Sequence, residues 1–503
     1  MYQEILINVE AEEKRVAIIE DKNLEEFFVE RQDTQRLVGN IYKGVVESVV
    51  PAIGAAFVNI GLGKNGFLYV QDLKPLDYEK MAEIINRPAA YQGAGNRNKE
   101  SGPIDIRKML KVGQQVLVQV TKEPLGKKGP RLTTHLSLAG RFLVLMPAES
   151  HLGISRRIQD GKERARLREL LQGLNVPRDI GLIVRTAGRG STKRDFLQDL
   201  RYLTNLWRKI KAYSQRKAAP SLVHQEYDLV LRVIRDNFTV QANKLLVDSK
   251  EEFKRIMRFL SIFAPNLRPR VQFYHAEVPL FEKKGAEDKI AKIYDRQVFL
   301  SSGGYLMIEP TESLVAIDVN SGRFTGKKDP EENACLVNVQ AADEIARQIR
   351  LRDLGGIVII DFIDMKLPKN KKRVLDVLHA ALKRDHAKTD ISAVSGLGLV
   401  EMSRQRARKS LESVVYQPCH YCQGKGLVKS AATMAIFVLR RLKKILRLKQ
   451  TQAIFVFVHP QVASFLVNEN RQSIVNLENL HKVKISVKQN ANLHIEELKI
   501  EIA

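Results

Sequence analysis

The chain has 503 residues, enough for several domains that each bury a hydrophobic core. It carries 82 Lys and Arg against 57 Asp and Glu, and the formal charge of +25 favours a polyanionic partner, either nucleic acid or an anionic membrane surface. No apolar run reaches about 18 residues and the first residues lack a signal core, which counts against a membrane span and against secretion. Only three cysteines are typical of a reducing cytoplasm. We therefore expect a cytoplasmic protein that binds nucleic acid.

Short strands dominate the first 120 residues. Residues 2–30 alternate apolar runs with charge and predict a small antiparallel pair. From Gly39 to Val120, further short strands separated by Gly, Asn and Pro predict a closed Greek-key barrel of the OB type. Residues 86–103 predict a polar loop.

Aromatic residues on the predicted barrel suggest a contact with nucleic acid. Phe57, Phe67 and Tyr69 fall on strands, with Lys43, Lys64 and Lys128 nearby. Rings placed in this way can stack on single-stranded bases. The alternative is that they fill the interior of the barrel, and for any one ring the two are equally weighted.

Residues 133–215 predict a mixed α/β segment. Strands are expected over 138–145 and 181–184, and helices over 162–174 and 203–216. After the second strand follows a compact cluster that can hold an anion, because arginine offers a fork of donors and glycine exposes backbone amides: Arg185, Thr186, Gly188, Arg189, Gly190 and Ser191. The charges of the helix over 203–216 are typical of a solvated face rather than of a dedicated groove.

Two apolar runs, 314–317 and 357–360, each end in an aspartate, Asp318 and Asp361. Continuous runs of this kind predict strands buried on both faces in a parallel sheet. The segment 331–350 between them has apolar residues at helical spacing, so the unit is β-α-β. Because ligands bind at the carboxyl ends of such strands, both aspartates are expected at one site.

Two converging carboxylates in a basic protein predict a Mg²⁺ site that faces a phosphodiester. Side chains alternate along a strand, so Asp318 shares a face with Asn320, whereas Asp361 and Asp364 point to opposite sides if the strand continues. The alternative is that each aspartate only caps a helix or forms a turn, which is less frequent for two neighbouring strands than for one. Asp364 is expected to be structural.

Cys419 and Cys422 have the C-x-x-C spacing of a zinc knuckle. A closed structural site needs four ligands, and the remaining cysteine, Cys335, is predicted in the core of the crossover helix. Either histidines complete the site or two chains share one ion. A redox pair is the third possibility, but the strand-to-helix context that such pairs need is missing.

The segment from Ala431 to Ala503 predicts a separate small α/β domain. A basic helix is expected around 438–446 and strands near 454–458 and 483–487. Such a domain can extend an RNA surface or serve oligomerisation, and the sequence leaves both open.

The chain resembles the ribonuclease E and G family over nearly its whole length. The resemblance is carried by residues 39–44, 184–188, 316–321, 351–356 and 360–365. Because no long scaffolding tail follows the small domain, the chain is more similar to ribonuclease G or a short form, as residues 398–402 also indicate.

The resemblance implies a multidomain α/β protein whose OB-type barrel is inserted in a ribonuclease-H-like subdomain. The implied limits are 1–35 and 230–293 for the two parts of that subdomain, 36–134 for the OB-fold RNA-binding domain, 135–229 for a 5′-end sensor, 294–415 for a deoxyribonuclease-I-like catalytic core, 416–429 for the zinc link and 430–503 for the small domain.

The resemblance also implies roles for single residues. Asp318 and Asp361 would hold the catalytic Mg²⁺ with support from Asn320; Phe57, Phe67 and Lys128 would contact RNA; Gly140, Val144, Arg185, Thr186 and Lys388 would form a pocket for a 5′ monophosphate; Cys419 and Cys422 would share one Zn²⁺ with a second chain. The last pocket position is arginine in ribonuclease E, and a lysine there attracts phosphate as a point charge rather than as a bidentate fork.

The expected function is that of a Mg²⁺-dependent endoribonuclease. It would cleave single-stranded A/U-rich RNA, with stimulation by a 5′ monophosphate, in ribosomal RNA maturation and mRNA decay, as a homodimer or homotetramer. The rival interpretation is a non-catalytic RNA-binding or ribosome-associated factor, which the same charge and barrel support.

Overall fold

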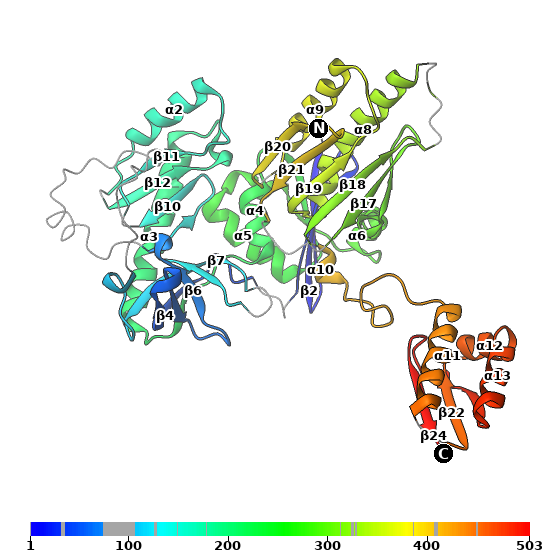
Figure 1. The fold of residues 1–503 in the computed structure, drawn as a ribbon. Helices are drawn as coiled ribbons and strands as arrows, with labels where there is room; N and C mark the ends of the chain where they lie inside the picture. Colours follow the sequence, from blue (N-terminus) through cyan, green and yellow to red (C-terminus); the bar gives the residue numbers. More distant parts are fainter. Residues whose placement is uncertain are drawn as a thin grey trace. The chain divides into compact units, whose positions relative to one another are not determined.

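The computed structural model describes residues 2–31, 36–73, 106–124, 128–147, 149–177, 179–311, 313–322, 326, 329–385, 387–406, 411–448 and 451–503. The chain divides into two compact units, Met1–Leu411 and Glu412–Ala503 (Figure 1). Among the described residues, no helix has the length and apolar character needed to cross a membrane.

A five-stranded sheet joins the start of the chain to a segment some 240 residues later. Its order is β15 (Val271–Phe273), β14 (Ala242–Val247), β1 (Gln3–Val9), β2 (Glu13–Glu20) and β3 (Asn23–Arg31), and β1 runs antiparallel to β2 but parallel to β14. The predicted antiparallel pair was therefore incomplete. Both faces of β1 are covered, one by α4 (Leu229–Asn237) and α5 (Lys250–Phe263), the other by α6 (Leu280–Lys283) and α7 (Glu287–Ala291).

The predicted closed barrel is confirmed. Strands β4 (Ile41–Val50), β5 (Ala55–Asn59), β6 (Gly66–Tyr69), β8 (Arg131–Thr133) and β7 (Gln115–Lys122) follow one another, and pairing of β4 with β7 closes the ring. Strand β13 (Ser221–His224) adds to the edge of β4. Gly44 permits the closure, because a Cβ there would lie 2.5 Å from Val58 Cγ1. The polar loop predicted over 86–103 lies outside the described residues.

The next segment forms a four-stranded sheet in the order β11 (Leu152–Ile154), β12 (Ile180–Val184), β10 (Leu143–Pro147) and β9 (Leu138–Ala139). Helices α2 (Gly161–Gln172) and α3 (Lys193–Arg216) share its core. The strand predicted over 138–145 is wrong in its middle, because the amides of Arg141, Phe142 and Leu143 turn to bind the Asp199 carboxylate. Helix α3 starts ten residues earlier than expected, at a capping box formed by Thr192 and Asp195.

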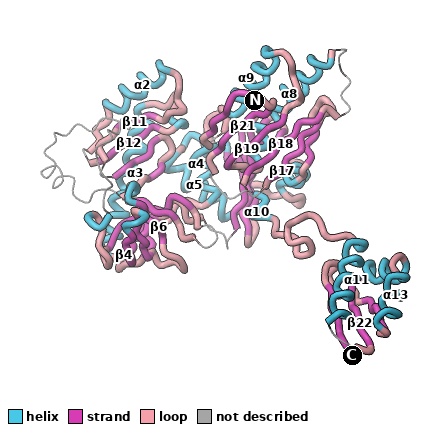
Figure 2. The backbone as a smooth tube through the Cα atoms, viewed as in Figure 1, coloured by secondary structure: helices cyan, strands magenta, loops and turns pink. Residues whose placement is uncertain are grey.

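A six-stranded mixed sheet follows, in the order β16 (Gln297–Phe299), β17 (Tyr305–Pro310), β18 (Leu314–Asn320), β19 (Gly356–Asp361), β21 (Leu399–Arg404) and β20 (Thr389–Val394). Helices α8 (Pro330–Leu351) and α9 (Pro368–Leu382) run side by side against it (Figures 1 and 2). The β-α-β unit is confirmed, but the expected parallel sheet is wrong, because β18 and β19 are flanked by antiparallel partners.

The prediction that these two strands are buried on both faces is also wrong. Val315, Ile317 and Val319 are buried against the helices, whereas the alternate residues of β18 are half-buried or exposed. Ile357 on β19 is 53% exposed. Apolar residues on the uncovered face made both runs continuous in the sequence, so periodicity could not reveal that one face is open.

The second unit is a small α/β domain, as predicted. After α10 (Leu411–Val415) come α11 (Ala431–Leu448), α12 (Pro460–Asn468) and α13 (Arg471–His481), which pack on a three-stranded sheet in the order β23 (Lys484–Gln489), β22 (Ala453–Val458) and β24 (Leu498–Ile502). Strand β22 is parallel to β23 and antiparallel to β24.

Candidate active site

Asp318 and Asp361 are direct partners across the parallel strands β18 and β19. Both side chains are exposed, and the residues that alternate with them, such as Ile317 and Ile360, are buried in the core beneath. The two carboxylates therefore stand side by side on the open face of the sheet. A direct cross-strand pairing places Cβ atoms about 5 Å apart, close enough for one ion to bind both carboxylates.

Asn320 supports this pair, as parity predicts. Its Nδ2 donates a hydrogen bond of 2.7 Å to Oδ2 of Asp318, which fixes the orientation of that carboxylate. Asp364 follows in the loop after β19, which ends at Asp361, so strand parity does not set the direction of its side chain.

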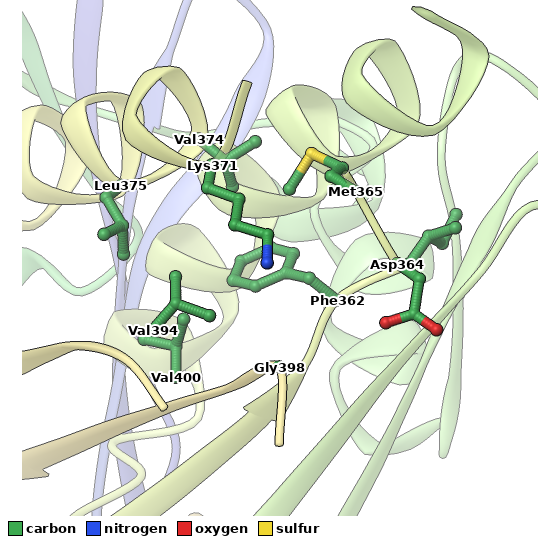
Figure 3. A pocket seen from close by; sticks show the side chains of 10 residues that line it. Phe362, Asp364, Met365, Lys371, Val374, Leu375, Val394, Gly398 and Val400 are labelled. Atoms are coloured by element: carbon green, nitrogen blue, oxygen red, sulfur yellow. The ribbon is translucent and has the colours of Figure 1, made fainter. Parts of the chain in front are cut away.

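Asp364 stands at the rim of a small cavity of about 20 Å³, room for about one water molecule. The cavity lies between the loop after β19, helix α9 and the strands β20 and β21, and Figure 3 shows Lys371 reaching from α9 toward the Phe362 ring. The Asp364 carboxylate approaches Gly398, 3.5 Å from the position that a Cβ would take there.

The electrostatics around Asp361 suit a cation. Partial burial raises the pKa of Asp361, and the negative charges of Asp318 and Asp364 raise it further. Among the described residues, no group of three or more His, Cys, Asp or Glu side chains is arranged to hold a metal. Mg²⁺ is commonly held by one or two carboxylates and completes its shell with water and phosphate oxygens, so a two-carboxylate site fits this ion.

Two residues of α8 fix the loop after β19, and neither was predicted from the sequence. Asn338 is fully buried; its Nδ2 donates to the Ile363 carbonyl at 2.8 Å, and its Oδ1 accepts from the Ile363 amide at 3.0 Å. The Glu331 carboxylate accepts hydrogen bonds from the amides of Lys366 and Leu367. A buried polar residue at a helical core position was the available signal for Asn338.

The aromatic residues of the barrel lie on its outer surface. Phe57 and Phe67 are cross-strand partners with ring centroids 5.8 Å apart, and Tyr69 stacks on Phe67 at 6.1 Å. The residues that alternate with them, Val58 and Leu68, are fully buried in the barrel core. The alternative that these rings fill the barrel is therefore wrong. Lys128 is exposed.

Arg185, predicted to bind a phosphate, already has two partners. Its Nη1 donates to the Gly140 carbonyl at 2.7 Å, and its Nη2 lies 2.7 Å from the Asp236 carboxylate. Gly140 is required at this turn, because a Cβ would lie 2.5 Å from both carboxylate oxygens of Asp199. Val144 is a half-buried residue of β10, next to this turn.

The rest of the predicted anion cluster is partly engaged within the fold. The amide of Gly190 donates to the Glu163 carboxylate at 2.8 Å, and the Thr186 hydroxyl lies 3.4 Å from that of Ser155. Lys388 lies just before β20, with its Nζ 4.0 Å from an Asp390 oxygen. Within the described part of the chain, no hydrogen bond or ion pair joins Lys388 to Arg185 or Thr186.

The paired cysteines form a turn in the second unit. The amide of Gly426 donates to Cys422 Sγ at 3.2 Å, and backbone amides of Cys422 and Tyr421 that donate to Cys419 lower the pKa of its thiol. Sulfurs that accept amide hydrogen bonds are suited to act as thiolate ligands of zinc, but two of them leave the site incomplete. Cys335 is buried in the core of α8, as predicted.

A model of the Ribonuclease E/G family matches residues 137–407, and a model of the RNase E/G thioredoxin-like domain matches residues 418–503. Ribonuclease G of Salmonella typhimurium is 37% identical over 478 residues, which make up 95% of each protein. Ribonuclease E of Haemophilus influenzae is 41% identical over 488 residues, or 97% of this chain and 50% of that protein. Ribonuclease E of Escherichia coli K12 is 38% identical over 94% of this chain and 43% of that protein.

The chain thus spans nearly all of the ribonuclease G relative and about half of each ribonuclease E relative. The family model covers both aspartates and the Arg185 turn, and the two models together reach from residue 137 to the last residue. By these matches, the chain belongs to the ribonuclease E/G family.

Proposed function

We propose that the protein is an endoribonuclease that cleaves single-stranded RNA at the open face of the six-stranded sheet. The observation that carries this proposal is the in-register pair Asp318 and Asp361, exposed on that face within the segment matched to the family. The names of its relatives, ribonuclease E and ribonuclease G, support the reaction class.

The residues around the pair have distinct tasks. Asp318 and Asp361 would hold Mg²⁺, with Asn320 orienting Asp318 through its hydrogen bond. Mg²⁺ bound there would stabilise the charge that develops on the phosphate and lower the pKa of a bound water. Asn338 and Glu331 hold the loop after Asp361 in one conformation, which keeps the carboxylates preorganised. The products would be a 5′ phosphate and a 3′ hydroxyl.

RNA would be held by the outer surface of the barrel. Phe57, Phe67 and Tyr69 form a continuous aromatic row, with Lys128 exposed nearby to attract the backbone, and this arrangement favours single-stranded RNA because only unpaired bases can stack on side chains. A preference for A/U-rich segments is consistent with the weaker pairing of such RNA.

A 5′ monophosphate would stimulate cleavage by binding at Arg185 and Thr186, beside Gly140 and Val144, with Lys388 adding positive charge. The Arg185 guanidinium is held in place by Gly140 and Asp236, so its position is fixed before an anion arrives. Because Asp236 neutralises part of the charge, the preference for the monophosphate is expected to be moderate.

Cys419 and Cys422 would bind one Zn²⁺ together with the same pair of a second chain, giving a homodimer or a pair of dimers. Two thiolates from one chain supply half of a tetrahedral shell, and this incompleteness supports sharing. We further propose a cytoplasmic role in ribosomal RNA maturation and mRNA decay, which the net charge of +25 and the family membership support.

The deciding experiment incubates the purified protein with a labelled single-stranded RNA and Mg²⁺. We expect internal cleavage that requires the metal and stops on chelation. Binding without cleavage under every Mg²⁺ and RNA condition would instead support the non-catalytic RNA-binding factor.

A further inference from the structure

One face of the small C-terminal sheet is left uncovered by the helices of its own domain. Ile454, Val456 and Val458 of β22 enter the core formed with α11, α12 and α13. Phe455 and Phe457 alternate with them and therefore project from the opposite face, outside that core. Both rings are half-buried.

Strand register shows which side chains surround these rings. Phe455 lies between Ser486 of β23 and Glu501 of β24, and Phe457 lies between Lys488 and Lys499. Direct partners across a sheet project to the same face. Phe457 therefore has a lysine on either side of it on the face that also carries Phe455. We call this surface, formed by Phe455, Phe457, Lys488 and Lys499, the aromatic sheet face.

The lysine ammonium groups lie over the rings. Lys488 Nζ is 4.5 Å from the Phe455 ring centroid and 5.6 Å from that of Phe457, and Lys499 Nζ is 5.7 Å from the Phe457 centroid. These cation–π contacts cover the rings with flexible stems rather than with a rigid helix. A flat aromatic ligand that carries phosphates can take the place of the ammonium groups over the rings, while its phosphates pair with those ammonium groups.

The charge of the surface selects among the occupants. Lys484 extends the lysines of β23, and Glu501, the one acid of these three strands on this face, is paired with Lys499 at 2.7 Å. A second copy of this chain docking face to face would bring two sets of lysines together, which costs free energy. Single-stranded RNA instead offers bases for the rings and phosphates for the lysines.

We propose that the aromatic sheet face is a second contact for single-stranded RNA, in which bases stack on Phe455 and Phe457 and phosphates pair with Lys488 and Lys499. The choice of RNA as the partner rests on the proposed function. The surface belongs to the second compact unit, whereas the barrel and the carboxylate pair belong to the first, and it gives the small domain a role in holding the substrate.

A local fluorescence probe tests this contact in the full-length chain. The single tryptophan, Trp207, is replaced in Trp207→Phe, and Phe457→Trp then places one reporter on the aromatic sheet face. A single-stranded RNA of about 15 nucleotides, long enough to span an aromatic platform, is added without Mg²⁺ so that it is not cleaved. We expect stacking to quench the tryptophan, less so with a duplex of the same length and less so at high salt.

The matched control is Phe437→Trp in the same background. Phe437 lies on α11, is 47% exposed and has Lys429 Nζ 5.9 Å from its ring centroid, so it is also a phenylalanine beside a lysine, but it stands on a helix and not in the aromatic pair of the sheet. We expect little quenching there. Absence of quenching at position 457 while anisotropy shows bound RNA, or equal quenching at both positions, would overturn the proposal.

A second measurement avoids dependence on one variant. RNA carrying 4-thiouridine should form a crosslink with the unaltered protein at the peptide that contains Phe455 and Phe457. The double variant Phe455→Ala and Phe457→Ala should remove that crosslink and weaken RNA binding about tenfold. Crosslinks confined to other peptides would contradict it, and a change of oligomeric state in the double variant without loss of the crosslink would indicate a protein interface. Both assays omit Mg²⁺, so their outcome is independent of whether the protein cleaves RNA.

Discussion

Asn338 and Ile363 exchange two hydrogen bonds, one in each direction, between a fully buried amide side chain and a backbone unit. Ile363 lies between Asp361 and Asp364, so this contact ties the loop after β19 to helix α8. A residue that is not itself a proposed metal ligand thereby helps to position the loop beside the proposed metal site.

Replacing Asn338 should impair cleavage without removing an acid. Asn338→Leu removes both hydrogen bonds to the half-buried backbone of Ile363, which should cost about 1–3 kcal/mol of stability. We expect kcat to fall while KM changes little, because the variant disturbs the alignment of the carboxylates but leaves the contacts with RNA intact. Steady-state kinetics below the unfolding temperature measure this. Gln340→Ala on the same helix, which contacts Ser301 and Ser302 instead, should leave kcat unchanged; equal effects of both variants would contradict the positioning role.

The preference for a 5′ monophosphate should depend on Arg185. We expect the unaltered protein to cleave a 5′-monophosphorylated RNA faster than its 5′-hydroxylated counterpart, and Arg185→Ala to erase the difference by losing a charge-assisted pair. Arg168→Ala serves as the control, because Arg168 is an exposed arginine of helix α2 outside the predicted anion cluster and should preserve the preference. Equal rates on both RNAs with the unaltered protein would refute a 5′-end pocket here.

Glu163 should make stability depend on acid pH. Hydrogen bonds from Arg166 and the Gly190 amide lower the pKa of Glu163 from 4.5 to about 2. A carboxyl with a lowered folded-state pKa stabilises the fold above its unfolded pKa and loses that contribution as pH falls from about 4.5 toward 2. Glu163→Gln should therefore lower the free energy of unfolding at neutral pH by about 1 kcal/mol or less, which is read as a lower thermal midpoint.

The pH series supplies the check on that variant. The difference in unfolding free energy between Glu163→Gln and the unaltered protein should become smaller as pH is lowered below 4.5. If this stability difference stays constant between pH 7 and pH 3, the destabilisation of Glu163→Gln comes from altered packing and not from the lost carboxylate charge.

The cysteine pair should control assembly. We expect one zinc ion for every two chains, and chelation or Cys419→Ser should convert the oligomer to smaller species with loss of zinc. Cys335→Ser, in a buried cysteine distant in sequence from the pair, should retain zinc. Mass photometry with metal analysis decides this, and one ion per chain at unchanged mass would rule out sharing.

Local sequence patterns predicted most of the helices and strands. The barrel strands, the β-α-β unit, helix α2 and the small α/β domain follow from alternation, helical spacing and turn residues. Parity along β18 also placed Asn320 beside Asp318, and the hydrogen bond between them confirms it.

Long-range pairing set the limits of that reasoning. The parallel partner of β1 lies about 240 residues away in the sequence. Strands β18 and β19 have antiparallel neighbours, and one face of their sheet is open. A short stretch of sequence contains no information on either feature. Asp199, drawn into the turn at Gly140, broke a stretch that propensity alone would keep as one strand. Asn338 and the pairing of Arg185 with Asp236 were missed for the same reason.

The most direct test of the account compares Asp318→Asn with Asp364→Asn in a Mg²⁺-dependent cleavage assay on single-stranded RNA. Asp318→Asn keeps the size of the side chain and its neighbour Asn320 but removes a charge from the in-register pair. We predict a loss of cleavage of about 100-fold or more, with RNA affinity nearly unchanged, whereas Asp364→Asn should stay within a few-fold of the unaltered protein. Substantial Mg²⁺-dependent cleavage by purified Asp318→Asn would contradict the assignment of this pair as the catalytic centre.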